Sequence, residues 1–124
     1  MNAIHLKCER APQGGLINLS FDKASGTYRS GFWNLSVEDA QRLVGGWIYL
    51  HQAKTVASQF GGMVLEFEQV QREELARKDR IVLVVAASLA GRGQAWRGKR
   101  HEMAWTGGLV EASLPHEQEA AAAM

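Results

Sequence analysis

The chain has 124 residues, a formal net charge of +1, 46% hydrophobic residues and 22% charged residues. This length suits one domain and excludes two, and the composition is that of a globular protein, not a disordered one. The near-neutral charge excludes a global field that would attract nucleic acid or a membrane. No apolar run approaches the roughly 18 residues of a membrane span.

Cys8 is the only cysteine, which excludes an intrachain disulfide and a multi-cysteine metal site. The start of the chain lacks the basic and apolar regions of a signal peptide. A lone cysteine without a leader fits a reducing compartment, so we expect a soluble, cytoplasmic protein. We expect a single domain over residues 1–115 and a disordered tail over residues 116–124, which are rich in Glu and Ala.

The first third of the chain alternates apolar and polar residues, a period typical of half-buried strands. Ile4, Leu6 and Cys8 mark the first run, and residues 17–21 and 27–34 mark the next two. Gly14-Gly15 and the cluster over residues 22–26 carry the turn signals between them. The pattern predicts three strands in succession.

A helix signal follows at Ser36. Its side chain can cap a helix, and Asp39 three residues later completes a pair like a capping box. Apolar residues then recur on one face at about 100° per residue, and His51 lies on that face. The pattern predicts one amphipathic helix over residues 37–59, with Gly61-Gly62 as its stop signal.

The period returns to two in the second half of the chain. Strands are predicted near residues 63–68, 81–87, 101–105 and 109–114, with a charged connection over residues 72–80. The run over 81–87 is continuous and β-branched, which is typical of a strand buried on both faces. The predicted fold class is α+β: about seven mostly antiparallel strands packed on one long α-helix, in the order β-β-β-α-β-β-β-β.

The loop over residues 91–100 is the most unusual segment, because it combines cations, glycines and a tryptophan. Its candidate binding residues are Arg92, Trp96, Arg97, Lys99 and Arg100. The cations can contact phosphates and the indole can stack on a base, which is typical of a single-strand nucleic-acid binder. A local cluster of this kind equally fits a solvated hairpin tip with its tryptophan folded back onto the sheet.

A second stripe on the predicted helix indicates self-association. Small residues and one leucine recur there with helical spacing, flanked by an aromatic residue. The candidate dimer interface consists of Gly46, Tyr49, Leu50, Ala53 and Ala57. A glycine costs about 1 kcal/mol in a helix interior, and the close approach of a second subunit would offset that cost. The alternative is that the glycine pair 45–46 breaks the helix.

His51 is the candidate catalytic residue. An imidazole on the apolar face could act as a general base or bind a small ligand in a pocket between helix and sheet. The alternative is a core histidine satisfied by one hydrogen bond. A long helix wrapped by an antiparallel sheet resembles hot-dog-fold thioesterases, which implies an acyl-group enzyme, although the helix carries its only acidic residues, Glu38 and Asp39, in its first turn.

Three further observations concern the class of function. The strands and helix start over about residues 1–60 resemble the single-strand-binding domains of the Whirly type. Four scattered histidines show no ligand spacing, so we expect no metal and no cofactor. Because Cys8 shares the inward parity of its strand, its thiol should be inert. The sequence thus favours a non-enzymatic, homodimeric accessory or binding domain, with nucleic-acid binding and a hot-dog-like enzyme as alternatives.

Overall fold

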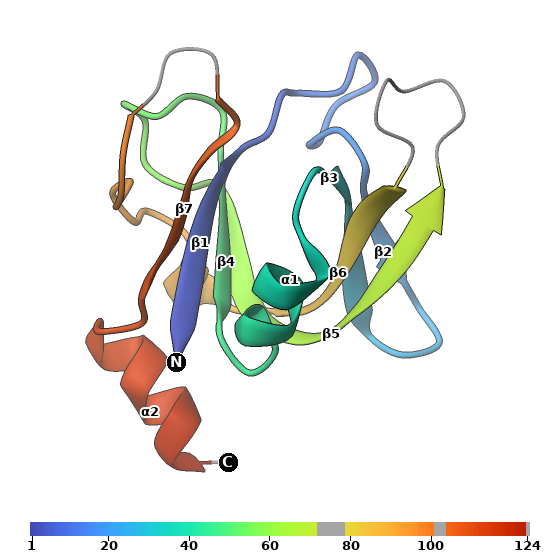
Figure 1. The fold of residues 1–124 in the computed structure, drawn as a ribbon. Helices are drawn as coiled ribbons and strands as arrows, with labels where there is room; N and C mark the ends of the chain where they lie inside the picture. Colours follow the sequence, from blue (N-terminus) through green and yellow to red (C-terminus); the bar gives the residue numbers. More distant parts are fainter. Residues whose placement is uncertain (72–78, 101–103, 124) are drawn as a thin grey trace.

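Strands dominate the architecture. A computed structural model of the chain describes residues 1–71, 79–100 and 104–123 (Figure 1). The strands are β1 (Asn2–Lys7), β2 (Leu19–Asp22), β3 (Thr27–Trp33), β4 (Trp47–His51), β5 (Phe60–Gln71), β6 (Asp79–Ala87) and β7 (Thr106–Glu111). The described helices are α1 (Val37–Leu43), α2 (Pro115–Ala123) and a short 3-10 turn, η1 (Leu89–Gly91).

All seven strands belong to one mixed sheet in the order β2-β3-β6-β5-β4-β1-β7. Every neighbouring pair is antiparallel except β1 and β4, which run parallel from Ala3 opposite Trp47 to Lys7 opposite His51. The prediction of a sheet-rich α+β fold is therefore confirmed. Residues 101–103 of the predicted strand over 101–105 lie outside the described residues. The same is true of residues 72–78 of the predicted charged connection over 72–80.

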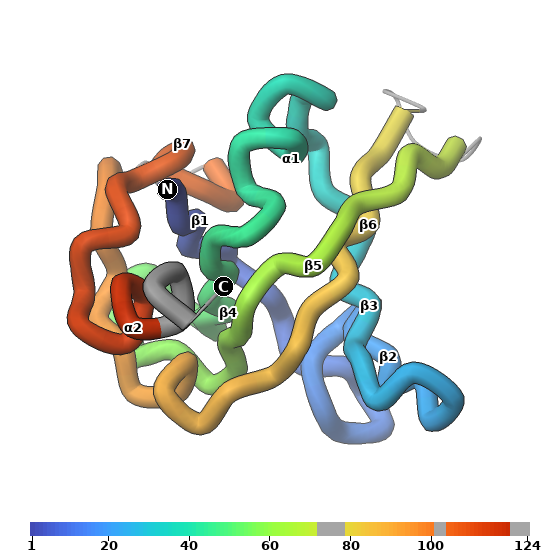
Figure 2. The backbone as a smooth tube through the Cα atoms, turned by 90° about the horizontal axis from the view of Figure 1, so that it is seen from below, coloured from blue at the N-terminus to red at the C-terminus, as the bar shows by residue number. Residues whose placement is uncertain are grey.

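The sheet is curved, as the backbone view of Figure 2 shows, and the main core lies on one of its faces. Side chains from β1, β3, β4, β5, β6 and α1 meet there. The buried members are Ile4, Leu6, Cys8, Trp33, Ala40, Leu43, Ile48, Leu50, Phe60, Val64, Ile81, Leu83 and Val85. Helix α1 covers this face by packing against β1, β5 and β6.

A second, smaller core lies on the opposite face of β1 and β4. Ala3, Trp47, Tyr49 and Ala112 are its buried members. Helix α2 lies outside the sheet beside this cluster (Figure 1), and its His116 ring packs against Trp47 with centroids 4.8 Å apart. Because both faces are covered, all five residues of β4 are buried.

The single long helix over residues 37–59 is wrong beyond Leu43. The predicted cap is correct, since Ser36 accepts a hydrogen bond from the Asp39 backbone N–H at 3.1 Å. The chain leaves the helix at Gly45, which has a φ of +83°, and enters β4 at residue 47. Gly61-Gly62, predicted to stop the helix, lies instead in β5 beside β4.

The physical reason lies at Gly46. An ideal Cβ there would stand 1.9 Å from the backbone oxygen of Asn2, so the chain passes β1 more closely than any side chain permits. The apolar run that follows fits a strand buried on both faces as well as it fits a helix stripe. Pairing that run with β1 and β5 outweighs its helical periodicity.

Two alanine substitutions distinguish this fold from a continuous helix, because the expected change in the free energy of unfolding has opposite signs in the two cases. Gly46→Ala should lower the free energy of unfolding by about 3 kcal/mol or more, because the backbone of β1 must move to admit a methyl group. Gly45→Ala, where no atom lies within 4 Å of the added Cβ, should cost only about 1–2 kcal/mol for its left-handed backbone. Urea unfolding measures both values. In a continuous helix both changes would stabilise the protein by about 1 kcal/mol, and that result would contradict the fold.

Candidate functional site

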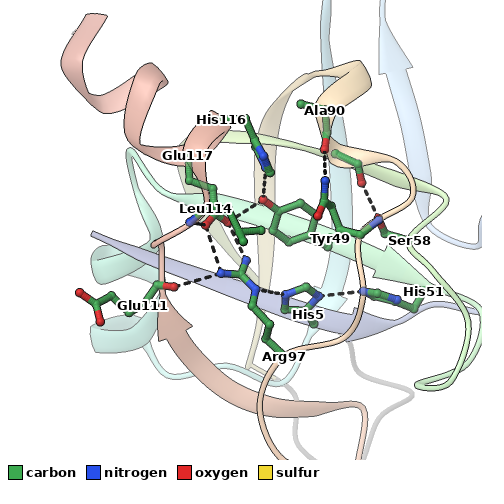
Figure 3. Close-up of polar contacts among 12 residues, drawn as sticks. His5, Tyr49, His51, Ser58, Ala90, Arg97, Glu111, Leu114, His116 and Glu117 are labelled. Atoms are coloured by element: carbon green, nitrogen blue, oxygen red, sulfur yellow. Dashed lines mark hydrogen bonds and ion pairs between the residues drawn. The ribbon is translucent and has the colours of Figure 1, made fainter.

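His51, the predicted catalytic residue, is fully buried at the end of β4 and belongs to a chain of hydrogen bonds (Figure 3). Its Nδ1 lies 2.7 Å from the Val56 carbonyl oxygen, and its Nε2 lies 2.8 Å from Nδ1 of His5. Arg97 Nε, which always carries its hydrogen, donates to Nε2 of His5 at 3.1 Å. His5 must therefore donate to His51 through Nδ1, and His51 must donate to Val56.

This directed chain requires both imidazoles to be neutral. Burial, together with smaller effects of the nearby His51 and Arg97, lowers the pKa of His5 to about 3. Burial lowers the pKa of His51 too, against the opposing effect of its bond to the Val56 carbonyl. A second proton on either ring would point one N–H at another. The geometry matches the core-histidine alternative more closely than a general base exchanging protons near neutral pH.

Arg97 continues the network into helix α2. Its guanidinium forms a bidentate pair with Glu117, with Nη1 3.1 Å from Oε1 and Nη2 2.6 Å from Oε2. The Glu117 carboxylate is fully buried and also accepts hydrogen bonds from the Tyr49 hydroxyl at 2.5 Å and the Leu114 N–H at 3.0 Å. Burial alone would raise the pKa of Glu117, but bonds from Arg97 and Tyr49 outweigh burial and lower it. Glu117 therefore stays ionised inside the protein.

Tyr49 joins the strand to the helix. Because its hydroxyl hydrogen goes to Glu117, its oxygen accepts from Nε2 of His116 at 2.6 Å. Burial and the bond to Glu117 raise the pKa of Tyr49 well above its usual value. The Arg97 guanidinium also lies over the tyrosine ring, 5.5 Å from its centroid. The expected disordered tail is thus corrected for the start of α2, which these contacts fix to the sheet.

The loop over 91–100 turns its aromatic residue inward. Trp96 is buried against His5 and His51, with ring centroids 5.7 and 5.1 Å away, and its Nε1 donates to the Lys99 carbonyl at 3.1 Å. The predicted base-stacking role of Trp96 is therefore corrected in favour of the folded-back alternative. Arg97 is committed to the network, whereas Arg92, Lys99 and Arg100 remain exposed.

The predicted dimer stripe does not form, because it was inferred from a helix that the chain does not adopt. Tyr49 and Leu50 are fully buried within the chain, and Gly46 lies against β1. Ala53 and Ala57 lie in the loop after β4, where the first is half-buried and the second exposed. Self-association stays a prediction for which these five residues supply no common surface.

A pocket of about 430 Å³ opens elsewhere, at the ends of β1 and β3. Its lining comes from Leu6, Lys7, Cys8, Glu9, Ile17, Asn18, Gly31, Phe32, Trp33, Asn34, Leu35, Arg80, Ala104, Trp105 and Thr106. We call it the aromatic pocket, because Phe32, Trp33 and Trp105 form its walls. Trp33 belongs to the core and donates through Nε1 to the Ser30 hydroxyl at 3.0 Å, while Trp105 is 51% exposed.

The charged residues in the lining of the aromatic pocket are two cations, Lys7 and Arg80, and one carboxylate, Glu9. The Lys7 ammonium lies 5.8 Å from the centroid of the Trp105 ring. The Arg80 Nε is buried and has no hydrogen-bond partner among the described residues, a state that it shares with Trp47 Nε1 and Lys54 Nζ outside the pocket. Asn18 and Asn34 add two side-chain amides to the lining.

Cys8 also lines the aromatic pocket but is not a nucleophile there. Burial raises the pKa of its thiol to about 11, and Sγ donates to the Ile17 carbonyl at 3.3 Å. The thiol is therefore protonated at neutral pH. This outcome agrees with the structural role predicted from the parity of the strand.

A second pocket, of about 540 Å³, adjoins the first. It is lined by residues 11–14 and 16–20, with Arg29, Gly31, Phe32 and Val82. We call it the loop pocket. Ile17, Asn18, Gly31 and Phe32 line both pockets, so the two meet along a shared wall. His51 lines neither one.

Sequence reasoning missed Glu117 and the aromatic pocket. Pro115 followed by Glu117 was a usable signal, because proline is favoured at the first position of a helix and glutamate at the third. The pocket gave no local signal, since its lining comes from five separate segments of the chain. Within the described residues, no three His, Cys, Asp or Glu side chains gather as a metal site would require.

Two general comparisons complete the description. None of the helices in the described part of the chain has the length and apolar character needed to cross a bilayer. Comparison of the chain with models of protein families, with curated proteins and with solved structures finds no match.

Proposed function

We propose that this chain is a non-enzymatic binding domain that holds a planar ligand in the aromatic pocket. The observation that carries the proposal is the combination of two indoles and a phenyl ring around a cavity of about 430 Å³, with Lys7 and Arg80 also in its lining. Pockets of about 300–1,000 Å³ with aromatic walls and a few polar groups are typical of small-molecule sites. Aromatic walls favour a flat ring, and Arg80 favours a ligand that carries an acceptor or a negative charge.

The state of the nearby reactive groups supports binding over catalysis. Cys8 is held as a thiol, and the two buried histidines are held neutral in a chain with fixed donor directions. The buried carboxylate of Glu117 is already engaged by Arg97 and Tyr49. None of these groups except Cys8 lines the aromatic pocket. A ligand there meets mainly apolar, amide and cationic surface and the single carboxylate of Glu9, with no histidine and no ionised thiol in the lining.

Trp105→Ala tests the site directly. Titration of nucleosides, flavin and indole carboxylates should quench the intrinsic tryptophan fluorescence, because Trp33 and Trp105 line the pocket. Removing the exposed indole should weaken the tightest binder by about 5- to 150-fold, the range expected for one stacking partner. Leu89→Ala removes a more exposed apolar side chain that lines neither pocket and should leave binding unchanged. Equal affinity in the Trp105 variant and the parent would contradict the proposal.

A further inference from the structure

We propose that helix α2 detaches from the sheet when His5 takes up a proton, while the sheet itself stays folded. The His116 ring of α2 packs against the rings of Trp47 and Tyr49, so detachment would uncover part of this smaller core. Such a switch would respond to acid whether or not the aromatic pocket holds a ligand.

The attachment of α2 to the sheet depends on its first turn. In that turn Glu117 is fully buried and His116 is half-buried. The two residues that follow, Gln118 and Glu119, are exposed, and the end of the helix extends beyond the sheet (Figure 1). A terminal segment with few buried side chains opens at a lower free-energy cost than a central strand. Helix α2 can therefore leave while the sheet remains folded.

A chain of hydrogen bonds connects this first turn to His5 (Figure 3). The Glu117 carboxylate pairs with both Nη atoms of Arg97, and Arg97 Nε donates to Nε2 of His5 at 3.1 Å. A proton on that ring nitrogen would set two N–H groups and two positive charges against each other. While α2 is docked, Glu117 and the Glu111 carbonyl oxygen, 3.1 Å from Nη1, keep Arg97 from turning away. Protonation of His5 and docking of α2 therefore oppose each other.

The other titratable groups that face His5 lie on β4. His51 Nε2 is 2.8 Å from Nδ1 of His5, and the Tyr49 ring stacks on the His5 ring with centroids 4.7 Å apart. In the docked form, burial and smaller effects of His51 and Arg97 lower the pKa of His5, and the charge of Glu117 only partly opposes them. Departure of α2 would let water reach the ring and raise its affinity for protons. Acid therefore favours detachment, by up to about tenfold per pH unit for one proton.

Hydrogen–deuterium exchange of the full chain, read by mass spectrometry at pH 7, 6 and 5, tests this switch. Protection factors, corrected for the intrinsic pH dependence of exchange, are compared for peptides that cover α2 and β6. We expect the protection of α2 to fall about tenfold between pH 7 and pH 5, while that of β6 changes by less than about twofold. An α2 whose protection is constant, absent already at pH 7, or lost together with that of β6 would overturn the inference.

His5→Gln identifies the group that takes up the proton. Glutamine keeps an acceptor for Arg97 and a donor for His51 but does not titrate, so the protection of α2 should be the same at pH 7 and pH 5. A variant that retains the pH dependence of the parent would contradict the role of His5. The imidazole ¹⁵N shifts of the parent give the same information without a substitution. His5 should become protonated over the pH range in which α2 loses protection, and a ring that stays neutral during the loss would overturn the inference.

Glu117→Gln tests the attachment itself at constant pH. The amide removes the charge that pairs with Arg97, so the protection of α2 should already fall about tenfold at pH 7, while that of β6 is retained. Glu119→Gln makes the same change at an exposed position of the same helix and should leave the protection of α2 unchanged. Equal protection in the two variants would show that the Arg97–Glu117 pair does not control detachment.

Discussion

Glu117→Ala is expected to lower the free energy of unfolding by about 3–5 kcal/mol, the usual cost of removing one partner from a buried ion pair. The loss leaves the Arg97 guanidinium uncompensated and leaves the Tyr49 hydroxyl and the Leu114 N–H without their acceptor. Urea unfolding followed by tryptophan fluorescence measures the change. Near-UV circular dichroism should show altered packing around Tyr49 and Trp47 at the same time.

Glu119→Ala is the matched control for this experiment. It removes the same carboxylate from an exposed position of the same helix and should change stability by less than about 0.5 kcal/mol. The double variant Glu117→Ala with Arg97→Met should recover part of the loss, because it removes the unpaired charge together with its partner. Equal losses for the two glutamate variants would show that the Arg97–Glu117 pair does not hold α2 to the sheet.

A second large effect is expected when the protein is acidified. The folded-state pKa of His5 is about 3, below its value of 6.5 in an unfolded chain, and His51 is shifted in the same direction. Below pH 6.5 the histidines therefore bind protons in the unfolded state that they do not bind in the folded state. The stability that the neutral histidines contribute is complete above about pH 6.5 and is lost progressively toward pH 3. Each histidine contributes a slope of about 1.4 kcal/mol per pH unit over its window.

Thermal unfolding at pH 8, 7, 6, 5 and 4 measures this dependence. The variant His5→Gln with His51→Gln should be less stable than the parent at pH 8, because the directed hydrogen-bond chain is broken. Its midpoint should nevertheless fall less between pH 7 and pH 5, because two groups that resist protonation are gone. A fall as steep as the parent's would assign the acid sensitivity to other groups, of which Glu117, with its lowered pKa, acts in the same direction at lower pH.

Much of the sheet could be predicted from local pattern. The alternation around Ile4 and Leu6 and the β-branched run over residues 81–87 lie in β1 and β6, and Ser36 caps α1 as expected. These signals are local, so a single sequence carries them. The helix prediction was wrong for residues 47–50, because a continuous apolar run fits both a helix stripe and a strand buried on both faces. The glycine pair 45–46 was the more reliable signal, because the free-energy cost of two glycines in a helix interior argues against a helix that continues through them.

The candidate site was less accessible to prediction, for a reason that lies in topology. His51 was singled out correctly as a buried imidazole, but its partners His5 and Arg97 lie 46 residues before it and 46 residues after it. The aromatic pocket likewise joins Trp33 to Trp105 across the curled sheet. No spacing rule links such positions, because the strand order that brings them together follows from pairings that the pattern does not specify.

The parallel pairing of β1 with β4 has a consequence for synthesis on the ribosome. Strand β1 precedes both of its neighbours, β4 and β7, in the chain, and β7 ends at Glu111. Because these non-local pairings must form before the sheet closes, folding should be slow and should not finish before β7 has been made. Nascent chains would keep an unpaired β1 edge in the meantime, a surface open to chaperones and to aggregation. A chain truncated before α2 would lack Glu117, the counter-ion of Arg97. Truncated chains should therefore be less stable and should be degraded more readily.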